Sequence, residues 1–260
     1  GAPLGEKGGA KFMVEEGVMN NPKVDAIFGL HAWPGKVGTV EYRSGPTMAA
    51  AERMRITVTG SQTHGAVPWK GVDPIAISSQ IITALQTIVA REVNITQVPA
   101  VVTIGSIHGG VRNNIIPEEV VMEGTIRTFN DEVRKDIHDS IRKKAEMIAS
   151  ASGATAKVEI FSDIAKVTFN EPSLTDKMVP SLERVYGKEN VKITPFITGA
   201  EDFPFFTDHA PGLYFFNGVA PDPSKAAPNH SPYFFADERN LKYGTKALTQ
   251  LAVDYLYLYK

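Results

Sequence analysis

The sequence predicts an α/β protein in which one compact β-α-β-β-α-β domain interrupts a second α/β domain. Residues 53–163 alternate between strand-like and helix-like patterns in that order. The segments before and after this block contain further strands that are apolar throughout, as expected for a sheet covered on both faces. We therefore assign residues 1–46 and 166–260 to the interrupted domain and residues 47–165 to the inserted one.

The interrupted domain is predicted from apolar spacing and from breakers. Residues 10–19 have helical spacing and stop at Asn20-Asn21-Pro22, and the apolar run 24–33 is closed by Pro34-Gly35, which indicates a strand. After residue 170 the pattern predicts another helix, two strands that share a sheet with the first, and a last helix. These elements are expected at residues 173–187, 190–196, 212–219 and 238–258.

The inserted domain is predicted to be a ferredoxin-like unit, a sheet covered by two helices. Asn130 is a favourable N-cap for its second helix, and Gly153 stops that helix. Its strands are expected at residues 53–60, 100–109, 118–129 and 155–163, and its helices at residues 73–93 and 131–152.

Composition excludes several functions. The formal net charge of −2 gives no field that would attract nucleic acid, and no apolar run is long enough to span a bilayer. The chain has no cysteine, so any metal must be bound by His, Asp or Glu. Residues 1–7 lack the features of a signal peptide. The compartment stays open, with the cytoplasm as the default.

The histidines are the first candidates for chemistry. His138, in a charge-rich helix, and His209, in a loop, are expected at the surface. His31 lies near the C-terminal end of an apolar strand, where ligand-binding groups often lie in α/β sheets; the alternative is a core histidine bonded to the backbone. His230 lies in a Pro-bounded loop that would aim its ring inward, or it is an ordinary loop residue.

Four more residues have both a functional and a plain interpretation. His64 lies in a Gly-flanked loop of the kind that often binds ligands. Asn114 lies between two strands, where asparagine commonly serves a turn. Glu201 and Asp202 form a carboxylate pair at a predicted helix N-terminus, where capping alone would explain them.

Taken together, these segments resemble the M20 family of metallopeptidases, and in particular its branch of N-acyl amino acid, hippurate and auxin-conjugate hydrolases. The resemblance covers essentially the whole chain. It implies a catalytic α/β domain that holds two divalent metal ions, Zn²⁺ or Mn²⁺, and an inserted lid and dimerisation domain. The motifs that carry it are GLHAWP (29–34), GPTMAAAERMRITVTGSQTHGAVP (45–68), GGVRNNIIP (109–117), EGTIRTF (123–129), GAEDF (199–203) and NHSP (229–232).

The resemblance also implies roles for single residues. His31 and His230 match ligands of the two metals, one each. His64 matches the histidine that, in family dimers, reaches the partner's active site and stabilises the oxyanion. Asn114 matches a substrate-binding residue, and we assign Glu201 and Asp202 a supporting role beside the site.

The family's other ligands come from a His or Cys motif and from a Glu-Glu pair, of which one member is a metal ligand and the other the general base. Neither motif has a counterpart in this sequence, and the resemblance implies that both lie upstream of residue 1. We do not assign Glu6, Glu15 or Glu16 to these roles. With one ligand per metal, the 260 residues alone are expected to bind little or no metal and to be inactive.

The predicted function of the intact protein is metal-dependent hydrolysis of the amide bond of a small N-acyl amino acid, in a homodimer formed through the inserted domain. One alternative is a truncated, non-catalytic family member that acts as a dimerisation or binding module. Another is a dipeptidase or desuccinylase of the same family.

Overall fold

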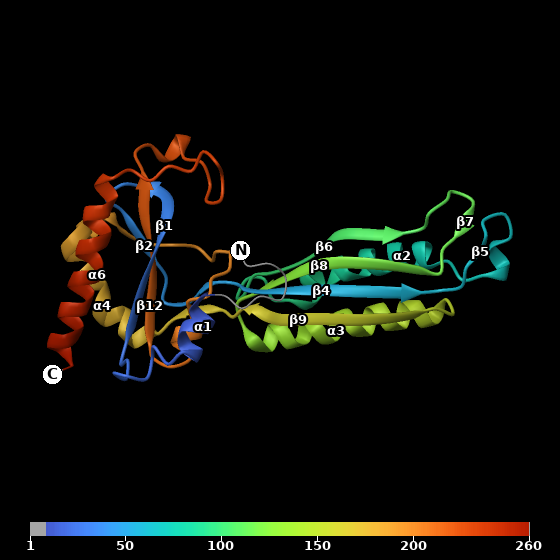
Figure 1. Cartoon of the computed structure of the whole chain (residues 1–260), viewed down its shortest axis with the longest axis horizontal. Helices are drawn as coiled ribbons and strands as arrows, with labels where there is room; N and C mark the ends of the chain where they lie inside the picture. Colours follow the sequence, from blue (N-terminus) through green and yellow to red (C-terminus); the bar gives the residue numbers. More distant parts are fainter. Residues whose placement is uncertain (1–8, 260) are drawn as a thin grey trace. The chain divides into compact units, whose positions relative to one another are not determined.

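The computed structural model describes residues 9–259, apart from the side chains of residues 163 and 164. Its contacts divide the chain into two compact units (Figure 1). The first unit combines the chain up to Met48 with the chain from Thr168 onward, and the second is Ala49–Val167. From the sequence, these boundaries were expected after residues 46 and 165.

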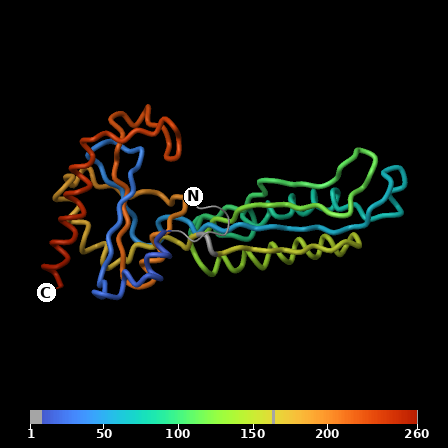
Figure 2. Tube along the Cα trace, in the orientation of Figure 1, coloured from blue at the N-terminus to red at the C-terminus, as the bar shows by residue number. Residues whose placement is uncertain are grey.

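The first unit contains a four-stranded sheet in which segments far apart in sequence are neighbours. Its order is β1-β12-β2-β11. β1 runs parallel to β12 with His31 opposite Phe216, so the early and late parts of the chain lie side by side (Figure 2). The strands are β1 Ile27–Lys36, β2 Val40–Tyr42, β11 Val191–Ile193 and β12 Gly212–Ala220.

The central strand β12 is buried along its whole length and divides the apolar residues of this unit into two clusters. Leu213 and Phe215 pack with residues of α4 (Pro172–Tyr186) and α6 (Arg239–Leu258) on one face. Because side chains alternate along a strand, Tyr214 and Phe216 belong to the other cluster. The rings of Tyr214 and Phe216 both lie beside that of His31, which places His31 on this second face.

Short elements complete the first unit. Glu171 caps α4 by accepting hydrogen bonds from the backbone N–H groups of Ser173 and Leu174. β3 pairs with β10 in a separate two-stranded sheet. The short elements are α1 Gly9–Glu15, β3 Gly45–Met48, β10 Thr168–Asn170, α5 Pro204–Thr207, and the 3₁₀ turns Lys188–Asn190 and Pro223–Lys225.

The second unit has the strand and helix order β-α-β-β-α-β. Its four-stranded sheet has the order β6-β8-β4-β9, and all its pairs are antiparallel. Two helices pack on the sheet, and the carboxylate of Asp73 and the amide oxygen of Asn130 cap them. The elements are β4 Ala50–Thr59, α2 Pro74–Thr87 with a π-helical extension Ile88–Glu92, β6 Ala100–Gly109, β8 Glu119–Thr128, α3 Asp131–Ala151 and β9 Thr155–Ala165.

A single apolar core lies between these helices and the sheet. Met54, Ile81, Met122 and Ile141 are fully buried in it. Burial of a large aliphatic side chain stabilises a fold by about 1.5–3 kcal/mol, so this core gives the second unit its own source of stability. The remaining elements are the 3₁₀ turn Pro68–Lys70 and a two-stranded sheet of β5 Thr63–His64 and β7 Ile115–Ile116.

The predicted α/β class is confirmed, and four local predictions are wrong. The strand expected over residues 24–33 is β1, which starts at Ile27 and continues through Pro34-Gly35 to Lys36. The helix expected over residues 10–19 ends at Glu15. The strand expected over residues 190–196 is shorter and consists only of β11. It lies at the edge of the sheet, and Ile193 is 70% exposed. An apolar run in the sequence does not reveal whether a strand is central or at an edge. His138 is half-buried and paired with Glu52, whereas the sequence indicated a solvated residue. Within residues 9–259, no helix is long and apolar enough to cross a membrane.

Candidate functional site

His31 lies in the middle of β1 rather than at the strand end expected from the sequence, and aromatic side chains surround it. Its ring centroid is 5.7 Å from that of Trp33, 6.4 Å from that of Tyr214 and 6.3 Å from that of Phe216. The imidazole is therefore a polar group in largely apolar surroundings, where its interactions with a charged ligand would be less screened by water.

One hydrogen bond fixes which nitrogen of His31 is available to a ligand. Nδ1 lies 2.7 Å from the carbonyl oxygen of Ala32. A carbonyl accepts only, so Nδ1 carries the proton, and in the neutral ring Nε2 carries the lone pair. A ring whose other nitrogen donates to a backbone carbonyl is the usual arrangement of a metal-binding histidine.

His230 lies in a turn that is tied to the same point of β1. The backbone N–H of Ser231 donates to the carbonyl of Pro228 at 3.2 Å, and His230, at the third position of this turn, has φ = 66°. It is the one non-glycine among the described residues in the left-handed region. Its neighbour Asn229 donates from Nδ2 to the carbonyl of Ala32 at 2.9 Å. This bond brings the segment that carries His230 to the residue after His31.

Glu201 and Asp202 do not cap a helix with their side chains, so capping does not explain them. The N-cap of α5 is Phe203, and it makes no side-chain capping bond. Instead, Asp202 accepts a hydrogen bond from the backbone N–H of Ala10 at 2.8 Å, at the start of α1. Glu201 accepts bonds from the backbone N–H of Asp202 and from the hydroxyl of Tyr214.

The bond from Tyr214 links Glu201 to the aromatic surroundings of His31. Burial raises the pKa of the Tyr214 hydroxyl, and the hydrogen bond to Glu201 and the negative charges of Glu201 and Asp202 raise it further. The hydroxyl therefore stays protonated and donates to the Glu201 carboxylate at any physiological pH. Glu201 is thereby held on the same face of the sheet as His31.

His64 and Asn114 lie together in the second unit. His64 in β5 pairs with Ile115 in β7, and the N–H of Gly65 donates to the carbonyl of Asn114 at 2.8 Å. Both residues are exposed. Nδ1 of His64 accepts a hydrogen bond from the N–H of Ala66 at 3.0 Å, so in the neutral ring Nε2 carries the proton and can donate.

The donor chemistry of the first unit fits a partial metal site. Zn²⁺ and Mn²⁺ accept imidazole nitrogen, and His31 presents an unprotonated Nε2. Within residues 9–259, however, no three His, Asp or Glu residues are grouped closely enough to hold a metal ion. His31 and His230 are the residues that would each contribute one ligand.

Sequence reasoning missed two groups of this site, Tyr214 and Asn229. The signal for Tyr214 is a tyrosine inside a mostly apolar, fully buried strand, because a buried hydroxyl needs a hydrogen-bond partner. Asn229 lies directly beside His230, but its partner is a backbone carbonyl 197 positions away. No local pattern reveals such a partner.

The profile of peptidase family M20/M25/M40 matches residues 4–254. Thermostable carboxypeptidase 2 of Saccharolobus solfataricus is 39% identical over 96% of this chain and 63% of its own length. N-acetyl-L-cysteine deacetylase of Bacillus subtilis is 38% identical over 91% of this chain and 55% of its own length.

Among solved structures, a Bacillus subtilis protein described as a dinuclear metal-binding peptidase of the M20 family matches with a TM-score of 0.75 and 30% identity. The match covers 95% of this chain and 61% of that protein. The chain thus spans less than two thirds of the length of each of these relatives.

Proposed function

Because this chain belongs to peptidase family M20/M25/M40, we propose that the intact protein is a metal-dependent amidohydrolase that cleaves small N-acyl amino acids. The names of the two relatives, a carboxypeptidase and an N-acetyl-L-cysteine deacetylase, both describe cleavage of an amide bond. The observation that carries the proposal is the bond between Nδ1 of His31 and the carbonyl of Ala32, which leaves Nε2 free for a metal ion.

In this proposal His31 and His230 each bind one of two divalent metal ions. Bound metals would polarise the scissile carbonyl and lower the pKa of an attacking water. The rings of Trp33, Tyr214 and Phe216 give His31 a largely apolar environment, which would strengthen electrostatic interactions there. Glu201 accepts a hydrogen bond from Tyr214, and Asp202 accepts one from Ala10, so both carboxylates would support the surroundings of His31.

The second unit would supply the groups that recognise the substrate. His64 can donate its Nε2 proton to the oxyanion that forms when the amide carbonyl is attacked. Asn114, held beside it through Gly65, has an amide that can bind the substrate's carboxylate or acyl oxygen. We propose that these residues act in the active site of a partner subunit, in a homodimer formed through the second unit.

The proposal is tested with the intact protein. We expect hydrolysis of N-acetyl and N-benzoyl amino acids to stop after dialysis against a chelator and to return with Zn²⁺ or Mn²⁺. Dipeptides and N-succinyl substrates in the same panel distinguish the dipeptidase and desuccinylase alternatives. No hydrolysis of any amide in the metal-loaded protein would favour the non-catalytic alternative.

Replacing His64 tests its assigned role. We expect His64→Ala to lower kcat by about 10²–10³-fold, the usual effect of losing one oxyanion donor. His64→Gln, which keeps an N–H donor near the position of Nε2, should recover part of that loss. Steady-state kinetics on the best substrate of the panel provide the measurement. A wild-type kcat in His64→Ala contradicts the assignment.

A further inference from the structure

The carbonyl oxygen of Ala32 is bonded by two side chains from opposite ends of the chain. Nδ1 of His31 lies 2.7 Å from it and Nδ2 of Asn229 lies 2.9 Å from it. A carbonyl has two lone pairs, so both donors can be satisfied at once. The orientation of this one peptide group therefore affects both the ring of His31 and the loop of His230.

The backbone at this point is not fixed by regular strand pairing alone. Ala32 and Trp33 are aligned with Asn217 and Gly218, but the register between β1 and β12 shifts between Trp33 and Lys36. A strand next to such an irregularity bends locally, and the ladder is disrupted there. An additional donor on the Ala32 carbonyl restrains the peptide close to this irregularity.

The loop of His230 also needs a restraint. His230 has φ = 66°, a conformation that costs about 1–3 kcal/mol for a residue other than glycine and persists only where surrounding contacts hold it. Asn229 is half-buried, and its side chain joins this turn to β1. The same bond therefore orients one imidazole and anchors the segment that carries the other.

We propose that Asn229 is a positioning residue that sets the orientation of His31 and the location of His230, and thereby the affinity for divalent metal. The inference rests on the proposed function, since it assigns metal binding to the two histidines. Asn229 itself binds no metal and touches no substrate in this scheme. Its loss should act through the rings of His31 and His230.

The test replaces Asn229 by leucine, which has a similar size, is uncharged and lacks a donor. In the intact protein we expect Asn229→Leu to bind Zn²⁺ or Mn²⁺ about 10–100-fold more weakly, the range found for loss of an outer partner of a metal ligand. Calorimetric titration with the metal alone measures this. In the metal-free protein, ¹⁵N-imidazole NMR should show that His31 no longer occupies a single tautomer.

Asn190→Leu is a matched control. Its Nδ2 also donates to a backbone carbonyl, that of Tyr186 at 2.8 Å, in the same unit. It should therefore lose a similar hydrogen bond without any change in metal affinity. Asn229→Gln keeps the amide donor and should retain an affinity between those of the wild type and Asn229→Leu. If Asn229→Leu does not fold, Asn229→Ser takes its place, because the shorter serine side chain cannot reach the carbonyl of Ala32. A wild-type metal affinity and a wild-type His31 spectrum in Asn229→Ser would overturn the proposal.

The two proposals fail in different ways. If the wild-type protein binds no divalent ion, or if His31→Ala binds it as tightly as the wild type, the proposed function is wrong. If His31→Ala loses metal but Asn229→Leu titrates like the wild type and keeps the wild-type ¹⁵N signals of His31, the positioning role is overturned and the proposed function stands.

Discussion

In the intact protein, His230→Gly is expected to abolish tight binding of one metal ion and at the same time to relieve backbone strain. Loss of a direct ligand should weaken binding by more than the roughly 100-fold that loss of an outer partner costs. Glycine adopts φ = 66° without steric cost, whereas histidine and alanine do not. The choice of glycine or alanine at position 230 therefore separates loss of the metal ligand from relief of backbone strain.

The comparison with His230→Ala measures the strain. Alanine also removes the imidazole but must keep the left-handed backbone conformation, which costs an L-residue about 1–2 kcal/mol. Glycine avoids this cost but loses more conformational entropy on folding, which offsets about 0.5–1 kcal/mol of the difference. We therefore expect the free energy of unfolding of metal-free His230→Gly to exceed that of metal-free His230→Ala by roughly 1 kcal/mol.

Two measurements decide this prediction. Elemental analysis after gel filtration should give fewer metal ions per chain for both variants than for the wild type. Urea unfolding of the metal-free proteins gives the stability difference, free of any contribution from metal binding. Full metal occupancy in both variants would remove His230 from the ligand set. Equal stability of the glycine and alanine variants would mean that the turn relaxes at no cost.

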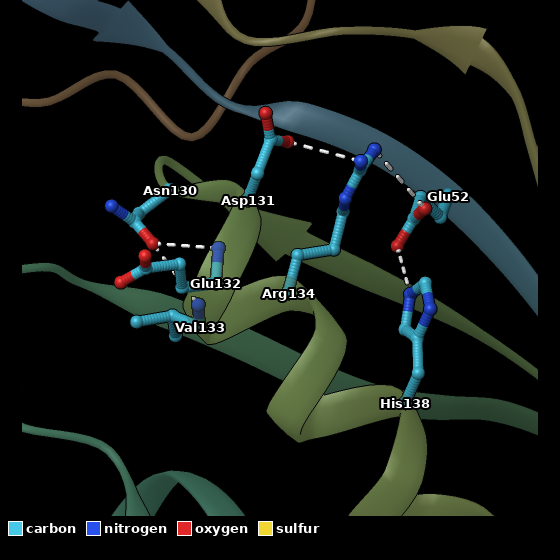
Figure 3. A network of polar contacts seen from close by, with 7 residues as sticks. All are labelled: Glu52, Asn130, Asp131, Glu132, Val133, Arg134 and His138. Carbon is cyan, nitrogen blue, oxygen red and sulfur yellow. Dashed lines mark hydrogen bonds and ion pairs between the residues drawn. The ribbon is translucent and has the colours of Figure 1, made fainter.

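The second large effect is expected in the second unit, at a carboxylate buried between β4 and α3. Glu52 is 1% exposed, and its Oε2 lies 2.6 Å from Nε2 of His138 (Figure 3). Arg134 lies farther away, 3.8 Å from Oε1. Removing the hydrogen-bond partner of a buried group typically costs about 1–3 kcal/mol, and more when that group is charged, because the group stays desolvated. We expect His138→Ala to lower the free energy of unfolding by about 2–3 kcal/mol at neutral pH.

The stability lost in His138→Ala should depend on pH, and the pKa of Glu52 sets the direction of that dependence. Burial alone would raise its pKa, but hydrogen bonds from His138 and Ser162 and the charges of His138 and Arg134 outweigh it, and the pKa is lowered. A carboxylate with a lowered pKa contributes stability above its unfolded value of about 4.3. That contribution is lost as the pH falls through the folded pKa, so the difference between wild type and His138→Ala should shrink below about pH 4.

Denaturant unfolding of the intact protein at pH 7 and at about pH 3 checks this prediction. The matched control is His108→Ala, because His108 is exposed on β6 and its loss should change stability by about 0.5 kcal/mol or less. A loss in His138→Ala that matches the control at pH 7, or that is the same at both pH values, would show that the Glu52 pair does not stabilise the unit.

Much of the architecture followed from local patterns. The limits of β6, α3 and α6 agree with the predicted elements within one residue, because each has an unbroken period and clear start or stop signals such as Asn130 and Gly153. The short strands β2, β3, β5, β7 and β10 were missed. Segments of two to four residues are too short to show a period, and their conformation depends on partners elsewhere in the chain.

The sequence by itself determined the α/β class, the order of elements in the second unit, and the histidines and carboxylates available for chemistry, because side-chain period and residue type are local properties. Only the tertiary structure decided which groups meet. The carbonyl of Ala32 joins His31 to Asn229, and Tyr214 bonds to Glu201, through partners that folding brings together from distant positions. The same holds for His138. Its charge-rich helix predicted a solvated side chain, whereas in the fold its ring lies beside the buried carboxylate of Glu52 on β4.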